Sequence, residues 1–358
     1  MQTFSIAIVP GDGIGREVTH PAFEIARQAA FDDGAKLEEA TYDWSSDYFL
    51  QHGRMMPSDA LDTLRPHAAI LLGAVGHPEI PDNVTLNGLL LPIRRTFDQF
   101  ANVRPAVLYQ GVDSPLKGLS PGDVDLVVVR ENTEGEYAQA GGFVHEFQEQ
   151  EVAVQTSVFT RHGVERIIRY AFDLARRRNK KRRVTSITKS NAQGFSMVLW
   201  DRVFQQVAAE YGDIETESLL VDAAAMNFVR RPQTFDVVVA SNLFGDILSD
   251  LSAMVTGSIG LAASANLDPS RRFPSMFEPV HGSAPDIAGK GIANPLAAIF
   301  SVAMMLEHLQ LPVAAARVDR AVRSVLAEGR ARTPDLGGSS STAEVINAVR
   351  TALTEPCA

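Results

Sequence analysis

The sequence predicts an α/β protein with much parallel sheet, organised as two domains. Strand-like apolar runs alternate with helical patterns almost throughout the chain, which is typical of βα units. The chain has 358 residues, which is long for one domain. The composition is 45% hydrophobic and 21% charged, ordinary values for a soluble globular protein able to bury a large core.

The first hundred residues alternate strand and helix patterns. Phe4–Val9 is an apolar run that ends at Pro10, and Gly15 then leads into a helix that extends to about Phe31. The further elements expected here are strands at Leu37–Tyr42, Ala68–Gly73 and Val103–Leu108 and a helix at Leu89–Phe100.

The middle and the end of the chain continue this alternation. Strands are expected at Asp125–Arg130, Val184–Thr188, Glu217–Val221 and Phe235–Ala240. Helices are expected at Val164–Arg178, Ala192–Tyr211, Leu243–Val255, Leu296–Leu306, Val313–Leu326 and Ala343–Leu353.

The segment from Glu136 to Thr160 breaks the pattern. Polar and apolar residues alternate there without a helical period, which predicts an antiparallel hairpin or arm. An arm inserted in an α/β chain fits a clasp between two subunits, and a surface hairpin on a monomer is the alternative.

Charge and composition exclude several classes. The net charge of −10 argues against a nucleic-acid partner, which requires a basic face. Cys357 is the only cysteine, so the chain has no intrachain disulfide framework, which fits a reducing cytoplasm. The chain enters a strand at once, with no basic region of a signal peptide, and its longest apolar run, Leu296–Leu306, is too short to span a bilayer.

A glycine-rich turn, Gly11–Gly15, follows the first strand. Its spacing is GxGxG, whereas the dinucleotide-binding fingerprint is GxGxxG. The turn permits a close approach of backbone to a ligand and indicates no more than that.

Asp246 and Asp250 are the most informative pair in the chain. On a helix, residues four apart lie about 40° apart around the axis, so their like charges repel. A divalent cation with oxygen ligands would offset that repulsion, whereas two solvated helix acids are the alternative. The pair follows the buried strand Phe235–Ala240, and ligands gather at the carboxyl ends of strands in open α/β sheets.

Three arginines suggest a site for carboxylates. Arg94 lies on a predicted helix, Arg104 follows it, and Arg130 ends an apolar strand where its charge needs a partner. Guanidinium groups bind carboxylates through two parallel hydrogen bonds, so three of them near one cleft suit a dicarboxylate. Pairing with internal Asp or Glu is the alternative.

Further polar residues follow strand ends. Tyr137 is a candidate proton donor, Lys189 a candidate base, and Asp222 a third candidate carboxylate. The loop Glu278–Asp286 has the composition of a rigid ligand-wrapping loop, and its aspartate is able to accept hydrogen bonds from ribose hydroxyls.

In combination and order, these segments resemble a known family, the metal-dependent decarboxylating 2-hydroxyacid dehydrogenases, which include the isopropylmalate and isocitrate dehydrogenases. The matching segments cover essentially the whole chain: Gly11–Gly15, Ile93–Arg95 with Asn102–Pro105, Arg130–Tyr137, Thr188–Asn191, Asn242–Asp250, and His281–Asp286 with Asn294–Pro295. The resemblance implies an isopropylmalate-dehydrogenase-like two-domain α/β fold with mixed sheets and not the Rossmann fold, in agreement with the glycine spacing.

Within the family, the chain is most similar to the tartrate/D-malate dehydrogenases. The similar segments are Asp43–Trp44, His52–Pro57, Gly73–Gly76, Phe97–Phe100 and Arg271–Pro279. One departure concerns the substrate, because that branch usually carries a tryptophan where this chain has Asn87. Gly88–Arg94 is also similar to the isopropylmalate enzymes, so 3-isopropylmalate is the alternative substrate; isocitrate is disfavoured because its enzymes carry a serine at the position of Gly88.

The resemblance also implies a role for each site residue. Arg94, Arg104 and Arg130 hold the substrate carboxylates, with Asn87, Leu90 and Asn191 as further substrate-binding residues. Mg²⁺ or Mn²⁺ is bound by Asp246 and Asp250 with Asp222 of the other subunit, whose Lys189 serves as base, and Tyr137 protonates the enol. The residues expected to bind NAD are Ile14, Gly73, Ala74, Glu278, His281, Gly282, Ser283, Ala284, Asp286 and Asn294. Asp286 favours NAD over NADP, and K⁺ is a further candidate cofactor.

The implied organisation is a homodimer with shared active sites. One discontinuous domain, residues 1–101 plus 257–358, carries most of the cofactor site, and residues 102–256 form the central dimerisation and metal domain with the arm near 136–160. No nucleic acid or membrane partner is expected. Two competing hypotheses are a catalytically silent paralogue and an unrelated α/β sugar-phosphate binder, and the second leaves the three arginines and three aspartates unexplained.

Overall fold

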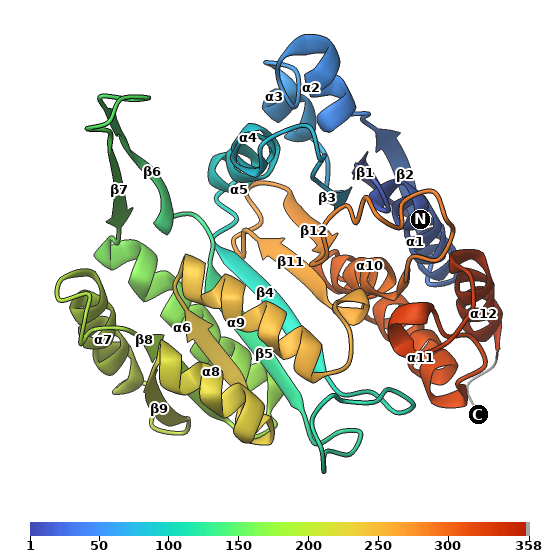
Figure 1. Ribbon diagram of the computed structural model, residues 1–358. Coiled ribbons are helices and arrows are strands. Elements are labelled where there is room, and N and C mark those ends of the chain that lie inside the picture. The colour runs from blue at the N-terminus through green and yellow to red at the C-terminus, as the bar shows by residue number, and fades with distance from the viewer. Residues whose placement is uncertain (356–358) are drawn as a thin grey trace.

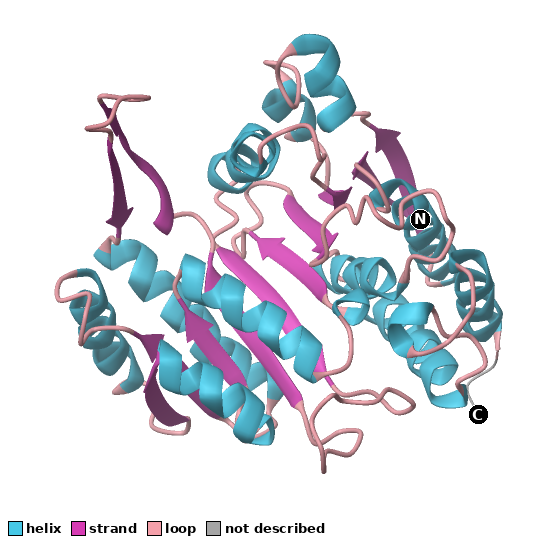
Figure 2. Ribbon diagram, in the orientation of Figure 1, coloured by secondary structure: helices cyan, strands magenta, loops and turns pink. Residues whose placement is uncertain are grey.

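One mixed sheet of ten strands runs through the protein, and helices pack against both of its faces (Figures 1 and 2). The computed structural model describes residues 1–355, so Cys357 and the expectation that rests on it lie outside the described residues. Within residues 1–355, none of the helices combines the length and the apolar character needed to cross a membrane.

The strand order is β2-β1-β3-β12-β11-β4-β5-β10-β8-β9. Most neighbours are parallel, but β11 is antiparallel to both β12 and β4, and β4 is antiparallel to β5. The strands are β1 Gln2–Gly11, β2 Ala35–Thr41, β3 Ala69–Ala74, β4 Ala101–Val107, β5 Asp125–Glu131, β8 Arg183–Thr188, β9 Glu215–Leu220, β10 Val237–Ala240, β11 Ala263–Leu267 and β12 Ser275–Pro279.

The expected α/β fold with a mixed sheet is confirmed. Its helices are α1 Gly15–Asp32, α2 Ser46–His52, α3 Ala60–Leu64, α4 Asp82–Thr85, α5 Leu91–Thr96, α6 Arg161–Arg178, α7 Ser196–Ala208, α8 Val221–Arg230, α9 Asn242–Val255, α10 Leu296–His308, α11 Pro312–Glu328 and α12 Thr342–Thr354. One π-helical turn, η1 Leu86–Leu90, leads into α5, and the 3-10 turns are η2 Pro232–Thr234, η3 Ile259–Leu261 and η4 Pro334–Leu336. Because the sheet is continuous, the division into two domains stays a prediction.

The core follows the alternation of side chains along the strands. In β1, Ile6 and Ile8 pack into one cluster, while Ala7 and Val9 pack into another on the opposite face. α10 is buried almost all round, which explains its continuous apolar run.

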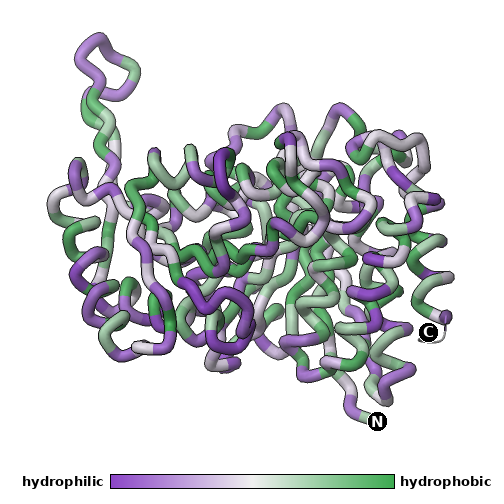
Figure 3. The backbone as a smooth tube through the Cα atoms, turned by 90° about the horizontal axis from the view of Figure 1, so that it is seen from below, coloured by the Kyte–Doolittle hydropathy of each residue, from purple (hydrophilic) through white to green (hydrophobic). Residues whose placement is uncertain are grey.

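The predicted arm is an antiparallel hairpin of β6 Gly135–Val144 and β7 Val152–Val158. It projects away from the rest of the chain (Figures 1 and 3), and every residue of β7 is exposed. Phe143 and Phe147 of the arm are 61% and 91% exposed, which is costly for large apolar side chains on a free surface.

Three expectations about elements need correction. The helix predicted at Leu89–Phe100 ends at Thr96, because Asp98 takes a positive φ of 45° and turns the chain into β4. The helix predicted at Ala192–Tyr211 is shorter, Ser196–Ala208. β11 and β12, which lie near the middle of the sheet, were not predicted at all.

Candidate active site

A polar cleft of about 250 Å³ lies where β3, β5 and β12 end, beside β4 and α9. In parallel sheets, strand ends converge on one edge, and ligand sites form there. Most of the catalytic and substrate residues predicted within one chain meet in this cleft. It is lined by Leu72, Gly73, Ala74, Val75, Leu86, Leu90, Arg94, Arg104, Arg130, Tyr137, Asp246, Asp250, Glu278, Pro279, Val280, His281 and Gly282.

The three predicted arginines line this cleft together. They come from α5, β4 and β5, and Arg94, Arg104 and Arg130 are only 3%, 7% and 2% exposed. Burial lowers the pKa of Arg130 to about 10, although the neighbouring carboxylate of Asp246 acts in the opposite direction. Three buried cations in one cleft form a strong site for anions.

Each of these arginines also has an internal carboxylate partner. Arg94 donates to Glu278 Oε1 over 2.8 Å, and both side chains are almost fully buried. Arg104 donates to Asp246 Oδ1 over 3.0 Å, and Arg130 donates to the same oxygen. The two interpretations of the arginines are therefore both present in the structure: internal pairing and convergence on one cleft.

Asp246 lies at the centre of the cleft. Burial alone would raise its pKa, but Arg130, Arg104 and the Tyr137 hydroxyl outweigh burial and hold the pKa at about 2. Asp246 is therefore a carboxylate at neutral pH.

Asp250 lies one helical turn further along α9 and also lines the cleft. Its Oδ1 lies 3.6 Å from the Arg104 guanidinium. Burial raises its pKa above the usual value, Arg104 opposes the rise, and the charge of Asp246 adds to it. The predicted pair of helix carboxylates thus faces one cleft, four residues apart.

Tyr137 reaches the cleft from the base of the arm. Its hydroxyl donates to Asp246 Oδ2 over 2.7 Å, and the Arg130 guanidinium lies 5.1 Å from the centre of its ring. Burial and then the charge of Asp246 raise the pKa of Tyr137, so its phenol keeps its proton at neutral pH.

Lys189 and Asp222 lie apart from this cleft. Lys189 Nζ donates to Asp222 Oδ1 over 2.7 Å, and the two side chains are 27% and 61% exposed. This hydrogen bond lowers the pKa of Asp222. Within residues 1–355 of one chain, no three His, Cys, Asp or Glu side chains are grouped to hold a metal ion, so a single chain does not unite the three predicted metal ligands.

The loop after β12 lines the cleft, and the glycine turn packs behind this loop. Ile14 N–H donates to the Ser283 carbonyl over 2.9 Å and joins the two segments. Gly73 allows the turn to approach, because a Cβ there would lie 2.1 Å from the Pro10 carbonyl oxygen. Ala74 ends β3 beside it.

The predicted cofactor residues of the loop differ in their surroundings. His281 is buried, and its Nε2 has no hydrogen-bond partner among the described residues. Gly282 has open space at its Cβ position, and Ala284 has a positive φ of 43°. Asp286 is exposed, whereas buried Asn294 donates to Asp335 Oδ2 over 2.9 Å. A buried nitrogen without a protein partner is free to bond a ligand or a water molecule.

Of the three remaining predicted substrate residues, one lines the cleft and two do not. Leu90 lines the cleft. Asn87, in the π-helical turn, accepts a hydrogen bond from Gln139 of the arm. Asn191 is exposed in the loop after β8 and lies outside the cleft of its own chain.

Several residues of the site were not singled out from the sequence. Asn242 Oδ1 accepts from Arg130 Nε over 3.0 Å, and Ser249 Oγ accepts from Arg104 over 2.7 Å. Both lie on α9, four residues before and three residues after Asp246, so the helical period could have identified them. Glu136, directly before Tyr137, contacts the start of α9.

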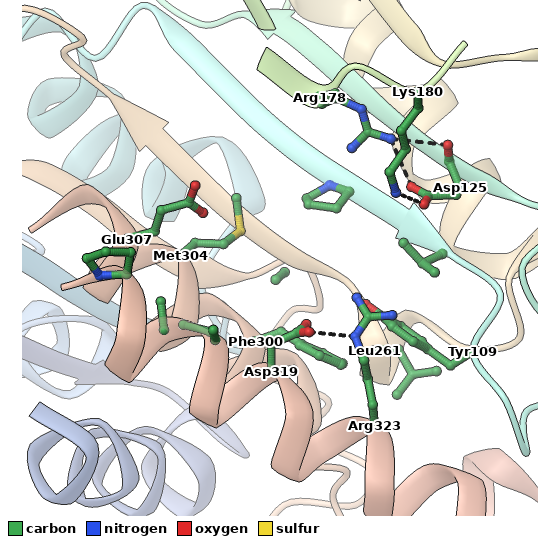
Figure 4. Close-up of a pocket in the computed structure, with 17 residues that line it drawn as sticks. Tyr109, Asp125, Arg178, Lys180, Leu261, Phe300, Met304, Glu307, Asp319 and Arg323 are labelled. Carbon is green, nitrogen blue, oxygen red and sulfur yellow. Dashed lines mark hydrogen bonds and ion pairs between the residues drawn. The ribbon is translucent and has the colours of Figure 1, made fainter. Parts of the chain in front are cut away.

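A second cavity, of about 390 Å³, lies on the opposite face of β4, between the end of α6 and helices α10 and α11 (Figure 4). Pro105 and Val107 line it, and they alternate with Arg104 along the strand. Its charged groups mostly pair with one another: Asp125 with Arg178 and Lys180, and Asp319 with Arg323. The cleft on the other face therefore remains the candidate active site.

Comparison with known proteins places the chain among dehydrogenases. The family described as isocitrate/isopropylmalate dehydrogenase matches residues 5–349. A probable tartrate dehydrogenase/decarboxylase of Agrobacterium vitis is 49% identical over 354 residues, 99% of this chain and 98% of that protein. The D-malate dehydrogenase (decarboxylating) of Escherichia coli is 49% identical over 356 residues, 98% of each chain.

A solved structure is similar over the whole chain. The isocitrate dehydrogenase of Methylococcus capsulatus superposes with a TM-score of 0.89 at 40% identity, covering 99% of this chain and 100% of that one. The ten-stranded α/β fold described above is therefore the fold of that enzyme.

Proposed function

Because this chain belongs to the isocitrate/isopropylmalate dehydrogenase family and is a decarboxylating dehydrogenase of its tartrate/D-malate branch, we propose that it oxidises a 2-hydroxy dicarboxylic acid of the tartrate/D-malate type. The hydride would pass to NAD, a divalent cation would polarise the substrate, and the β-keto acid formed would lose CO₂. The observation that carries this proposal is the cluster of three buried arginines facing two helix carboxylates in one cleft.

The charges of the cleft suit that substrate. Arg94, Arg104 and Arg130 are balanced in the free protein by Glu278, Asp246 and Asp250. A dicarboxylate adds two negative charges, and a divalent cation adds two positive charges, so the complex stays balanced. Isolated buried charges are costly, so substrate and cation are expected to bind together.

The residues present fit a divalent cation. Asp246 and Asp250 offer the carboxylate oxygens that Mg²⁺ and Mn²⁺ prefer, and Asp222 of a second copy of this chain would supply a third ligand. When bound, such a cation acts as a Lewis acid on the substrate hydroxyl and on the enolate left by loss of CO₂. K⁺ remains a further candidate cofactor.

The residues also fit NAD. The buried and unpaired Nε2 of His281 offers a hydrogen bond to a ligand, and exposed Asp286 is available to ribose hydroxyls. NAD supplies the redox chemistry, and this chain supplies its orientation beside the cleft.

Residues of the chain itself align the substrate and transfer protons in this proposal. The arginines fix the two carboxylates of the substrate and so align its reacting carbon. Lys189 of the second copy takes the hydroxyl proton, and Tyr137, which keeps its phenolic proton at neutral pH, returns a proton to carbon.

A homodimer with shared sites completes the proposal. Its support is the separation of Lys189 and Asp222 from the cleft and the exposed apolar side chains of α8, α9 and the arm. Met226 and Ile247 are 65% and 55% exposed, and exposed apolar surface of this kind is typical of a subunit interface when it forms a patch.

3-Isopropylmalate is the second candidate substrate. Leu86, Leu90 and Val75 line the cleft and offer an apolar surface to an alkyl substituent. The tartrate/D-malate type ranks first because the full-length relatives bear those names.

A substrate panel tests the function. The purified protein is assayed for NADH formation and CO₂ release with D-malate, tartrate, 3-isopropylmalate and isocitrate, with Mn²⁺ and K⁺ present. We expect activity with D-malate or tartrate that is lost on chelation and in Asp246→Asn. Activity with 3-isopropylmalate alone would replace the substrate, and inactivity with all four acids would refute the function.

A further inference from the structure

We propose that Glu136 is a positioning residue that fastens the base of the arm to the first turn of α9 and thereby holds Tyr137 at Asp246. The inference deepens the proposed function and rests on the role given there to Tyr137. It starts from the beginning of α9, where four backbone N–H groups of any helix lack partners within the helix.

The N-cap residue of α9 does not cap its own helix. Ser241 takes the N-cap position, but its side chain accepts no backbone N–H. Its hydroxyl donates instead to Glu136 Oε1 over 2.7 Å, while Glu136 Oε2 accepts the N–H of Leu243 over 3.1 Å. The carboxylate of a distant strand therefore acts as the cap, and the positive end of the helix dipole favours that charge.

The position of Glu136 in the chain gives this cap a further consequence. Glu136 directly precedes Tyr137, whose hydroxyl donates to Asp246 Oδ2 over 2.7 Å on the same helix. Consecutive side chains of a regular strand point to opposite faces, but the pairing of β6 is irregular between Gly135 and Ala140. The irregularity allows both neighbours to reach α9.

A third contact holds the same two segments together. Asn242, the first residue of α9, donates through Nδ2 to the Glu134 carbonyl over 3.1 Å. Its Oδ1 accepts from both Nε and Nη2 of Arg130. Gly135 fits between them with a φ of 80°, and a Cβ there would lie 3.4 Å from Asn242 Cβ. Residues 134–137 are thus docked on the first turn of the helix that carries Asp246 and Asp250.

This docking matters most for one step of the proposed reaction. Loss of CO₂ leaves an enolate, and the Tyr137 O–H bond breaks as a C–H bond forms at the carbon that lost CO₂. The phenolate then regains a proton from solvent. Hydride transfer comes earlier and does not involve Tyr137, so loosening the arm base is expected to slow the late step selectively.

The test compares Glu136→Ala with Glu136→Gln and with a matched control. Glu344 provides that control, because its carboxylate closes a capping box with Ser341 at the start of α12. Glu344→Ala removes a carboxylate that takes part in a helix cap outside the cleft. Both variants are therefore expected to lose some thermal stability.

Two readouts separate positioning from stability. The first needs no activity: hydrogen exchange of the α9 first-turn amides, including Leu243, is expected to speed up in Glu136→Ala and to stay unchanged in Glu344→Ala. The second is kinetic. In Glu136→Ala, kcat is expected to fall by about tenfold to a hundredfold, because misplacement of a catalytic group costs rates of that order. KM is expected to fall with kcat and kcat/KM to stay nearly unchanged, because the slowed step follows the loss of CO₂.

The time course of NADH formation should also identify which step has slowed. Pre-steady-state mixing of Glu136→Ala with substrate and NAD is expected to give a burst of NADH close to one per active site, followed by slow turnover. Glu136→Gln keeps one acceptor oxygen and should lie between wild type and Glu136→Ala in both readouts.

Three results would overturn the proposal. These are unchanged exchange in α9, faster exchange with unchanged kcat, and an equal loss of kcat in Glu344→Ala. Failure of the proposed function is recognised separately, because wild type would then form no NADH from any acid of the panel.

Discussion

Asp246 shows how one side chain organises the candidate site. Its Oδ1 is shared by Arg130 and Arg104, and its Oδ2 accepts the Tyr137 hydroxyl. A bound cation would compete with guanidinium groups for the same oxygen. Binding is therefore expected to free the arginines for the substrate carboxylates, which links the two binding events.

Glu131 is a second buried carboxyl, placed directly after Arg130 at the end of β5. It accepts hydrogen bonds from the Thr133 backbone N–H and hydroxyl and from the Glu134 N–H. Burial outweighs these bonds and raises its pKa to about 7 from the usual 4.5. The folded protein therefore binds a proton there that the unfolded chain releases near pH 4.5.

This difference predicts how stability depends on pH. Between about pH 4.5 and pH 7 the folded state holds more protons at Glu131 than the unfolded state, so its contribution to stability falls as pH rises. The slope is at most about 1.4 kcal/mol per pH unit for one group. We expect Glu131→Gln to remove this fall, as measured by urea unfolding across that range. Exposed Glu39→Gln on β2 is the control, and a Glu131→Gln curve parallel to wild type would contradict the prediction.

At the scale of elements, α9 was predicted almost to the residue, whereas β11 and β12 were not. The helix has a sustained period and a polar start. Ala263–Leu267 and Ser275–Pro279 are short and contain Ala, Ser, Asn and Pro, so neither period nor composition marks them as strands. Their place in the middle of the sheet comes from pairing with β3 and β4, which a local pattern does not contain.

In the candidate site, too, some features were predicted from the sequence and others were not. The sequence marked Arg94, Arg104 and Arg130 as candidates, and the family resemblance implied that they share one site. The structure brings them together in one cleft. The cap that Glu136 provides joins residues more than a hundred positions apart, so no spacing in the sequence indicates it. Roles that depend on a second copy, as for Lys189 and Asp222, remain predictions.

The packing of α9 against β5 depends on Gly245. A Cβ at this position would lie 2.6 Å from Arg130 Cβ and 3.1 Å from Arg130 Cα. The second of these is a backbone atom in the middle of a sheet, so the helix rather than the strand would have to move. The absence of a side chain at Gly245 is what lets α9 approach Arg130.

Gly245→Ala tests this contact, because two effects oppose each other. Alanine stabilises a helix by about 1 kcal/mol relative to glycine, whereas overpacking costs about 1–3 kcal/mol. Because the added Cβ would press on backbone atoms, the cost of overpacking is expected to exceed the gain in helix propensity. We therefore expect Gly245→Ala to lower the free energy of unfolding and to reduce kcat/KM. Gly212→Ala, with open space at its Cβ, is the control. An unchanged or raised free energy of unfolding in Gly245→Ala would show that α9 is free to shift.

For the whole molecule, the central feature is that one chain holds only part of its proposed machinery. The arginines, Tyr137, Asp246 and Asp250 share one cleft, while Lys189 and Asp222 pair with each other at an exposed position. An exposed ion pair contributes little to stability, so a purely structural role explains this pair poorly. The projecting arm and the exposed apolar side chains of α8 and α9 offer surfaces that the proposed second copy would cover.

Hybrid dimers test this account most directly. One variant carries Lys189→Ala with Asp222→Asn, the other carries Tyr137→Phe with Asp246→Asn, and each is expected to be inactive alone. Co-expression with different tags gives hybrids in which one of the two sites contains only wild-type residues. A random mixture should then recover about a quarter of wild-type activity, because the two sites of a symmetric dimer are built alike. Purified hybrid dimers as inactive as either parent would contradict the shared site.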